Sequence, residues 1–124
     1  MIFLNKLSDI ESAERTDAGV AYTVRLHAEH PIYRGHFPGE PVTPGVCILQ
    51  MALELLSDAV GESLALGGLQ NVKFLQILRP EGMPVRVDIS RIERSGGEVK
   101  AQVDVSAADA MVAKISLTCR KIAE

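Results

Sequence analysis

Residues 46–60 read VCILQMALELLSDAV, a run in which nearly every side chain is apolar. Its main polar members, Gln50, Glu54 and Asp58, recur every four residues and therefore share one narrow stripe on a helix. A helix this apolar has to be covered on most of its circumference. The run therefore predicts one long helix, packed against the remainder of the chain.

The segment before this run, residues 30–44, is predicted to be a loop. It holds four prolines, at positions 31, 38, 41 and 44, together with two glycines. Prolines this close together are incompatible with a regular helix or a central strand. We expect Thr43 to cap the helix, Pro44 to occupy its first turn and Gly61 to end it.

Strands are predicted on both sides of the helix. Apolar and polar residues alternate over 22–26, as in a half-buried strand, whereas residues 69–78 are apolar on both faces. Gly67 and Gly68 are interpreted as a turn. Further turns are expected at 17–19, 79–82, 95–98 and 107–109. Because short turns join antiparallel strands, the sequence predicts an α+β fold with five or six antiparallel strands against the helix.

Length and composition exclude several classes of protein. With 124 residues, residues 1–124 are expected to form a single domain. No uncharged apolar run reaches the roughly 18 residues of a membrane span, and the N-terminus lacks a charged stretch followed by an apolar one. We therefore expect neither a transmembrane nor a secreted protein. The net charge of −3 and the 4% of aromatic residues do not support nucleic-acid binding. A cytoplasmic protein without membrane or nucleic-acid partners is the expectation.

Charge is unevenly distributed between the two halves of the chain. Residues 1–68 hold four basic and nine acidic side chains, whereas residues 69–122 hold nine basic and six acidic ones. A basic C-terminal half is suited to an acidic partner, since charge guides encounter. The excess of basic residues in this half is explained equally well if Lys and Arg protect solvent-exposed strand edges from pairing with other chains.

His36 and Gly45 are the candidates for chemistry. His36 lies in a loop that prolines constrain, which suits a general base that must hold one orientation. Gly45 lies where the helix begins, and a residue without a side chain lets a carbonyl approach the unpaired N–H groups there. Together they suit removal of a proton alpha to a carbonyl. A structural role for His36 is the competing interpretation.

Other arrangements of reactive residues lack support. His27, His30 and His36 have no carboxylate or thiol at a metal-ligand spacing. Cys47 and Ser57 do not lie in a nucleophile motif. The sequence therefore implies neither a metal nor a cofactor.

The run GHFPG at 35–39, followed by Pro41-Val42 and Pro44-Gly45-Val46, resembles the signature of the beta-hydroxyacyl-(acyl carrier protein) dehydratases. The segment from Asn71 to Phe74 is also similar to the first long strand of that family. The resemblance implies the hot-dog fold, a long central helix wrapped by a curved antiparallel sheet. It also implies a homodimer, or a higher oligomer of dimers, with active-site tunnels at the interface.

The resemblance assigns a role to several positions. His36 matches the catalytic histidine that handles the alpha proton, its ring oriented by a carbonyl near Val42. Gly45 matches the glycine whose N–H polarises the thioester carbonyl. Phe37 and Val46 would line the entry of the acyl tunnel. The substrate implied is a 3-hydroxyacyl thioester on acyl carrier protein, for which Arg34, Lys73 and Arg79 are candidate docking residues.

One position departs from the family pattern. Fourteen residues after His36 the family places a helix carboxylate, contributed across the dimer interface, and here that position is Gln50. An amide cannot deliver a proton. Glu54 follows one turn later, about 6 Å along the helix axis. Three explanations stay open: Glu54 acts as the acid, the protein catalyses an altered or weaker reaction with His36 and Gln50, or a related hot-dog subunit supplies the acid.

These explanations leave three functions in view. The first is a dehydratase of 3-hydroxyacyl thioesters, a lyase. The second is a hot-dog acyl thioesterase, in which Gln50 and Glu54 position water. The third is a non-catalytic acyl-binding subunit of a heteromeric dehydratase.

Overall fold

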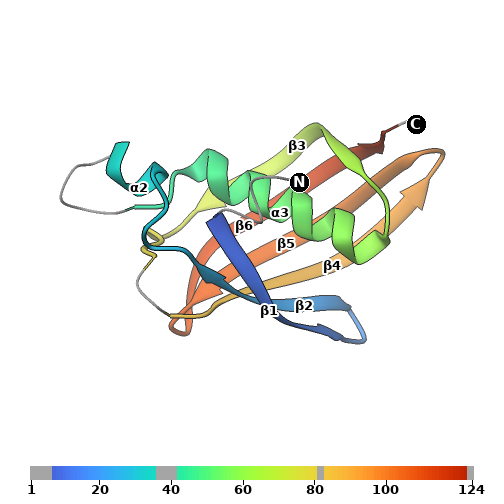
Figure 1. Ribbon diagram of the computed structural model, residues 1–124. Coiled ribbons are helices and arrows are strands. Elements are labelled where there is room, and N and C mark those ends of the chain that lie inside the picture. The colour runs from blue at the N-terminus through green and yellow to red at the C-terminus, as the bar shows by residue number, and fades with distance from the viewer. Residues whose placement is uncertain (1–6, 36–41, 81–82, 123–124) are drawn as a thin grey trace.

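The computed structural model describes residues 7–35, 42–80 and 83–122, in which one long helix lies across an antiparallel sheet (Figure 1). The helices there are α2 (Ile32–Gly35) and α3 (Gly45–Val60). The strands are β1 (Ser8–Arg15), β2 (Gly19–Leu26), β3 (Leu64–Phe74), β4 (Val85–Ser95), β5 (Glu98–Ala107) and β6 (Ala110–Lys121). They form a six-stranded sheet in the order β1-β2-β4-β5-β6-β3, with each neighbouring pair antiparallel. The predicted α+β class is confirmed.

The hydrophobic core lies between α3 and one face of the sheet. Val103 of β5, Ile115 of β6 and Leu55 of α3 are completely buried. Residues in β5 alternate strictly, with apolar side chains toward the helix and polar ones toward the opposite face. An antiparallel sheet with one solvated face produces this alternation. Neither helix in the described ranges has both the length and the apolar character that a membrane span requires.

Several predicted turns are confirmed. Thr16 and Gly19 bond to each other's backbone across the turn between β1 and β2. Gly96 and Gly97 both have positive φ in the β4–β5 hairpin, at 55° and 88°. Ala108 and Asp109, which join β5 to β6, also have positive φ, so this second tight turn forms without a glycine.

The predicted cap at the start of α3 is wrong, whereas the predicted end is confirmed. Pro44 occupies the N-cap position and makes no side-chain capping bond. The Thr43 hydroxyl is instead hydrogen-bonded to the buried Tyr33 hydroxyl, at 3.0 Å. At the other end, Gly61 adopts the left-handed conformation with φ of 74°. Its glycine identity suits that conformation because a side chain would be strained there.

The prediction of a continuous loop over 30–44 is also wrong. Residues Ile32–Gly35 form the single helical turn α2, immediately after Pro31. Proline is well tolerated at the start of a helix, and one turn is short enough to end before the next proline. Residues 36–41 lie outside the described part of the chain.

Gly67 and Gly68 do not form a turn but lie within β3. The pairing of β3 with β6 shifts register between Leu66 and Gly68, which marks a bulge. A Cβ atom on Gly67 would lie 3.1 Å from the carbonyl oxygen of Thr118. Glycine inside a strand often marks such a bulge or a close backbone approach. The strand then ends at Phe74, earlier than the predicted residue 78.

Candidate active site

The start of α3 presents backbone N–H groups that the helix itself does not use. The N–H groups of Cys47 and Ile48 both donate to the Pro44 carbonyl, at 3.0 and 3.2 Å. Those of Gly45 and Val46 come before the first intrahelical bond and have no acceptor within the helix. The Val46 side chain is 72% exposed. This end therefore combines N–H groups that the helix does not use with the positive end of the helix dipole.

Phe74, the last residue of β3, packs against the first residue of this helix. A Cβ atom built on Gly45 would lie 3.0 and 3.1 Å from the Cζ and Cε2 atoms of the Phe74 ring. Any side chain at position 45 would therefore force the ring to move. Phe74 is itself 49% exposed, so its ring forms an outer wall of the helix start. The sequence did not assign Phe74 to the site, although the Asn71–Phe74 resemblance was a signal.

The described residues on either side of 36–41 are tied to each other. The hydroxyl groups of Tyr33 and Thr43 lie 3.0 Å apart. The Thr43 N–H donates to the Leu78 carbonyl, at 2.8 Å. Burial raises the pKa of the Tyr33 phenol above its usual value, which keeps the hydroxyl neutral. His36 and Phe37 lie outside the described residues, and Val42, just after them, is partly buried.

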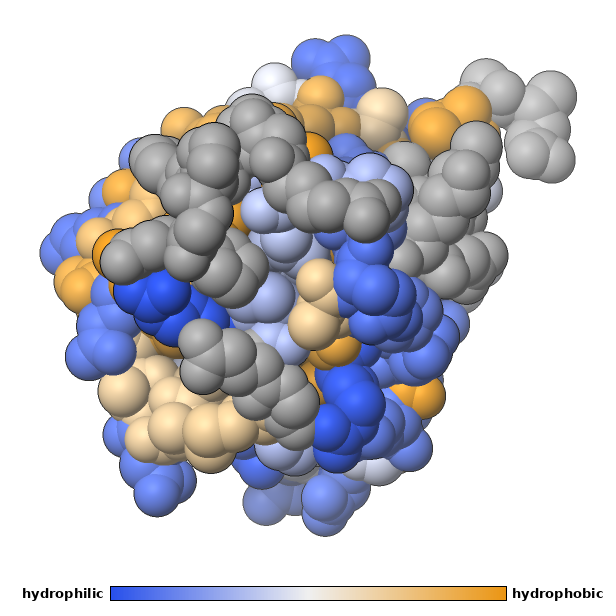
Figure 2. Space-filling view, turned by 60° about the vertical axis from the view of Figure 1, so that its left-hand side comes forward, coloured by the Kyte–Doolittle hydropathy of each residue, from blue (hydrophilic) through white to orange (hydrophobic). Residues whose placement is uncertain are grey.

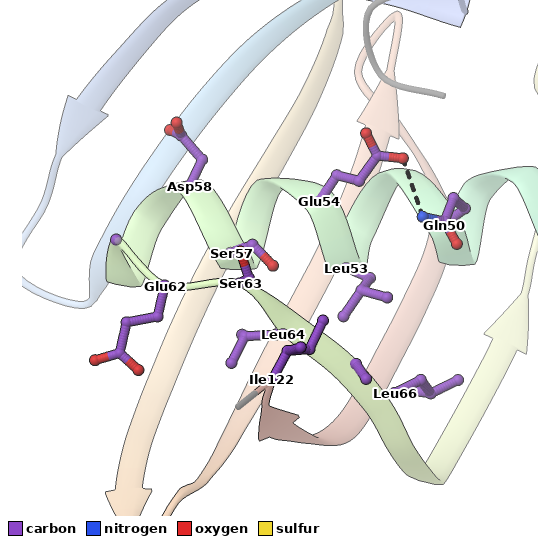
Figure 3. Close-up of a pocket in the computed structure, with 12 residues that line it drawn as sticks. Gln50, Leu53, Glu54, Ser57, Asp58, Glu62, Ser63, Leu64, Leu66 and Ile122 are labelled. Atoms are coloured by element: carbon purple, nitrogen blue, oxygen red, sulfur yellow. Dashed lines mark hydrogen bonds between the residues drawn. The ribbon is translucent and has the colours of Figure 1, made fainter. Parts of the chain in front are cut away.

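Gln50 and Glu54 are brought together on the polar stripe of α3. The Gln50 Nε2 atom donates to Oε2 of Glu54, at 3.1 Å, as the dashed line in Figure 3 marks. Glu54 is only 4% exposed, and nine-tenths burial is unusual for a carboxylate. Gln50 lies about 7.5 Å along the helix axis from Gly45. The helix thus places an oriented amide–carboxylate pair near its open end.

A cavity of about 760 Å³ runs beside this pair. It is lined by Gln50, Leu53, Glu54, Ser57, Asp58, Gly61, Glu62, Ser63, Leu64, Ala65, Leu66 and Ile122. In Figure 3, Leu53, Leu64 and Ile122 gather on one side of the helix, whereas Glu54 and Asp58 extend from another. The cavity therefore has an apolar wall and a polar wall, as ligand sites commonly do.

The far end of the cavity holds groups that already have partners. The Tyr22 hydroxyl donates to Oδ2 of Asp58, at 2.6 Å. Lys121 Nζ lies 3.1 Å from Oε2 of Glu62. Burial, followed by the bond to Asp58, raises the pKa of Tyr22. These contacts join α3 and the turn that follows it to the sheet, and they hold the wall of the cavity in place.

Metal and thiol chemistry gain no support from the geometry. Across the described ranges, no group of three His, Cys, Asp or Glu side chains could hold a metal ion. The thiols of Cys47 and Cys119 are buried, and burial raises both pKa values, that of Cys119 to about 11. A protonated, buried thiol is a poor nucleophile.

The end of the molecule that carries the helix start faces the viewer in Figure 2. Pale orange, hydrophobic atoms form a group at the lower left of this view, next to strongly hydrophilic blue ones. The large apolar side chains that are exposed in the described chain include Leu69, Leu75 and Ile77.

Solved structures define the class of fold. The dehydratase heterocomplex ApeI:P from Xenorhabdus doucetiae aligns with a TM-score of 0.72 at 18% identity, over 91% of this chain and 97% of that one. A hypothetical thioesterase protein with coenzyme A from Streptococcus pneumoniae aligns with a TM-score of 0.67 at 11% identity, over 94% and 90%. The chain has the hot-dog fold, as the sequence resemblance implied.

Sequence comparisons then identify the family. The profile described as "ApeI-like: ApeI dehydratase" matches residues 11–115. The 3-hydroxyacyl-(acyl-carrier-protein) dehydratase FabZ of Syntrophobacter fumaroxidans is 30% identical, over 84% of this chain and 76% of its own length. That of Ligilactobacillus salivarius is 27% identical, over 94% and 86%. The chain belongs to the ApeI-like dehydratase family of hot-dog proteins.

Proposed function

We propose that this protein dehydrates 3-hydroxyacyl thioesters carried by acyl carrier protein. A base removes the alpha proton, the beta hydroxyl takes up a proton and leaves as water, and an enoyl thioester remains. The chemistry calls for a base, a group that polarises the thioester carbonyl and an acid. The FabZ relatives are named as dehydratases of 3-hydroxyacyl groups on acyl carrier protein. We assign the base, the carbonyl-polarising group and the acid to the residues described below.

In this proposal His36 is the base and Gly45 polarises the carbonyl. Gly45 begins α3, where backbone N–H groups have no acceptor in the helix. The Tyr33–Thr43 bond holds together the two described ends from which the 36–41 segment extends. Phe37, Val42 and Val46 line the entry for the acyl chain. Phe74, packed against Gly45, joins them as a wall.

The hydrogen bond between Gln50 and Glu54 is the main observation behind our choice of the general acid. Glu54 is buried, faces the cavity and accepts a bond from Gln50, at 3.1 Å. A carboxyl group can deliver a proton to a leaving hydroxyl, whereas an amide can only hold it. We assign the acid to Glu54, with Gln50 as the residue that orients it. The two residue types are thereby exchanged relative to the family pattern implied by the sequence.

The active unit in this proposal is a dimer. β3 lies at one end of the sheet order, and Leu69 and Phe74 of this strand are exposed. A long edge strand with exposed apolar side chains is suited to pairing with another chain. We propose a homodimer, or a pair with a related hot-dog subunit as the name of the ApeI:P heterocomplex describes for that protein.

Turnover of a purified 3-hydroxyacyl thioester tests the assignment. Formation of the enoyl thioester, followed by its ultraviolet absorbance, is expected, and His36→Ala should abolish it. Release of a free thiol and a carboxylic acid would instead establish the thioesterase function, for which Glu54 could position water. If no product forms and an acyl chain still binds, the protein is a non-catalytic acyl-binding subunit.

Carrier docking is tested separately, because charge guides encounter without performing the chemistry. Lys73 lies in β3 next to Phe74, which packs against the start of α3. Arg79 follows after that strand has ended, directly after Leu78, whose carbonyl accepts a bond from the Thr43 N–H beside the helix start. The side chain of Arg34, the third expected docking residue, lies outside the described part. Lys73→Glu and Arg79→Glu should raise KM for the carrier-bound substrate and leave KM for a small 3-hydroxyacyl thioester without the carrier unchanged. An unchanged KM for both substrates would remove the docking role.

A further inference from the structure

His30 accepts hydrogen bonds from the first two backbone N–H groups of α2. Its ring Nδ1 atom accepts the Ile32 N–H, at 3.0 Å, and its carbonyl accepts the Tyr33 N–H, at 3.1 Å. Pro31, which lies between them, has no N–H to satisfy. A helix of one turn is not stable by itself, so the bonds at its start matter for its order. His30 is therefore the capping residue of α2.

The bond from Ile32 determines the protonation state of the His30 ring. A backbone N–H can only donate, so Nδ1 of His30 is the acceptor and carries no proton. The ring in this structure is therefore the neutral tautomer, with its proton on Nε2. When the ring takes up a second proton, Nδ1 becomes a donor that faces the Ile32 N–H, and the capping bond is lost. The usual capping residues, Ser, Thr, Asp and Asn, do not change in this way near neutral pH.

α2 connects this cap to the proposed active site. Tyr33, the second residue of the turn, is buried, and its hydroxyl lies 3.0 Å from that of Thr43. Thr43 comes two residues before Gly45, with which α3 begins, and the two helices lie at the same end of the molecule (Figure 1). Gly35, the last residue of α2, directly precedes His36 in the sequence. An ordered α2 therefore fixes the described residues on either side of 36–41.

Other titratable side chains lie close to His30. A hollow of about 470 Å³ has His27, Glu29, His30 and Pro31 in its described lining. The His27 Nε2 atom lies 2.7 Å from Oδ2 of Asp9 in β1, and Glu29 is exposed. Because histidine side chains commonly change charge between pH 5 and 8, an experiment has to separate His27 from His30.

We propose that His30 is a positioning residue, whose neutral ring holds α2 and thereby the turn that leads to His36. Protonation of Nδ1 removes the cap, so α2 loosens and turnover falls as the pH falls. The effect on turnover rests on the proposed function, because it requires His36 to act as the base. The cap itself follows from the bonds to Ile32 and Tyr33 and can be measured without turnover.

Nitrogen chemical shifts of the full chain measure the cap directly. At pH 8 the His30 Nδ1 signal should be that of an unprotonated acceptor, with the proton on Nε2. Between pH 8 and pH 5 the amide signals of Ile32 and Tyr33 should move with the same midpoint as the His30 ring. In His30→Asn an amide oxygen takes the place of Nδ1 and accepts at every pH in this range, so the Ile32 amide signal should stay nearly constant.

Rates of enoyl thioester formation measure the consequence for turnover. His30→Ala should lower kcat/KM at pH 8 about fivefold to tenfold, which is the equilibrium equivalent of losing a typical capping bond. His30→Asn should restore most of this loss, because asparagine is a good capping residue. As the pH is lowered from 8 to 6, kcat/KM should fall less steeply in His30→Asn than in the natural chain, because His30 no longer contributes a proton to the profile.

His27→Gln is the matched control. It keeps a side-chain nitrogen that can donate to Asp9, and it removes the other histidine that lines the same hollow. The pH dependence of the Ile32 amide signal and of kcat/KM should both remain as in the natural chain.

Two outcomes would overturn the proposal. The first is an Ile32 amide signal that titrates in His30→Asn as it does in the natural chain, or that stops titrating in His27→Gln, since another group would then hold the proton. The second is a kcat/KM at pH 8 that is as low in His30→Asn as in His30→Ala, since an acceptor at this position would then not be what α2 needs. If the natural chain forms no enoyl thioester, the proposed function and the effect on turnover both fail, whereas the chemical shifts still decide whether His30 caps α2.

Discussion

The two ends of α3 differ in how completely the chain satisfies them. At the C-terminal end, the N–H groups of Gly61 and Glu62 both donate to the Ser57 carbonyl, at 2.9 and 3.2 Å, and Gly61 takes the left-handed conformation. At the N-terminal end, the N-cap residue Pro44 makes no side-chain capping bond, and the neighbouring Thr43 hydroxyl is hydrogen-bonded to that of Tyr33. One end is closed by local interactions and the other is left open.

The closed end of α3 contributes to stability, whereas the open end serves the proposed function. A closed end such as that at Gly61 follows the ordinary rules of helix termination. Natural proteins tend to break such rules where a site needs unpaired groups. The N-cap residue Pro44 leaves the N–H groups of Gly45 and Val46 without its capping bond, and such a bond is typically worth about 1 kcal/mol. Changes at the open end should therefore alter catalysis, and changes at the closed end should alter stability.

Glu54→Gln should have the largest effect on activity. It keeps the shape of the side chain and a hydrogen-bonding partner for Gln50, yet it removes the only group of this pair that can deliver a proton. General acid catalysis contributes about 10²–10⁴ in rate, so kcat for enoyl thioester formation should fall by that factor.

Asp58→Asn is the matched control for this change. Asp58 lies one turn later on the polar stripe, lines the same cavity and accepts a bond that the amide oxygen of asparagine can also accept. It should change kcat by less than about threefold if the acid is Glu54. Equal losses in both variants would instead mean that the cavity needs negative charge in general, without a specific acid.

Gly45→Ala should have the next largest effect. Its Cβ would lie 3.0 Å from the Phe74 ring, so the ring has to shift away from the helix start. Displacing a positioning group by about 1 Å can cost up to about 10² in rate, and we expect kcat/KM to fall about 10- to 100-fold. The midpoint temperature of thermal unfolding should not fall by a corresponding amount, because alanine is a better helix former than glycine.

A second substitution distinguishes steric displacement from other causes. Phe74→Leu removes part of the ring that the new methyl group meets, so Gly45→Ala combined with Phe74→Leu should recover part of the lost kcat/KM. If the double variant is no better than the product of the two single losses, the contact between positions 45 and 74 is not responsible.

Gly61→Ala should act on stability and leave activity unchanged. Nothing lies within 4 Å of a Cβ at this position, so the cost is only that of holding alanine at φ of 74°. A left-handed conformation costs about 1–2 kcal/mol for a residue with a side chain. Urea unfolding should report a loss of this size, with kcat/KM unaltered. A fall in kcat/KM as large as that of Gly45→Ala would remove the distinction between the two helix ends.

Most of the fold could be predicted from the sequence, because apolar periodicity determines which faces are buried. The helix, its end at Gly61 and the antiparallel strands all follow from that pattern. Gly67 and Gly68 were misjudged because a glycine pair suits a turn and a bulge alike, and only pairing with β6 selects the bulge. The cap at Thr43 failed because Tyr33, distant in the sequence, competes for its hydroxyl.

The candidate site was predictable in part. Spacing along the helix placed Gln50 and Glu54 on one face, and the structure joins them by a hydrogen bond. The contact between Phe74 and Gly45 could not be predicted, because it depends on where β3 ends against the helix. The roles of these residues, and that of His36, stay predictions until the kinetic experiments are done.

Tyr22→Phe should have the smallest effect, again at the closed end of α3. The variant loses the hydrogen bond to Asp58, which is worth about 0.5–1.5 kcal/mol, while the exposed Asp58 carboxylate turns to water. Burial raises the pKa of Tyr22 in the folded protein above 10.0, its value in the unfolded chain. The folded state therefore holds this proton more tightly than the unfolded state.

The sign of the pH dependence follows from that difference. Below pH 10.0 both states keep the phenol protonated, so its contribution to stability is complete. Above it the unfolded chain loses the proton first, and the free energy of unfolding should fall by up to about 1.4 kcal/mol per pH unit. Urea unfolding between pH 9 and 11 should therefore show a shallower decline in Tyr22→Phe than in the natural chain. Parallel declines would mean that the Tyr22 phenol is free to ionise in the folded state, and that the contact with Asp58 does not hold the closed end.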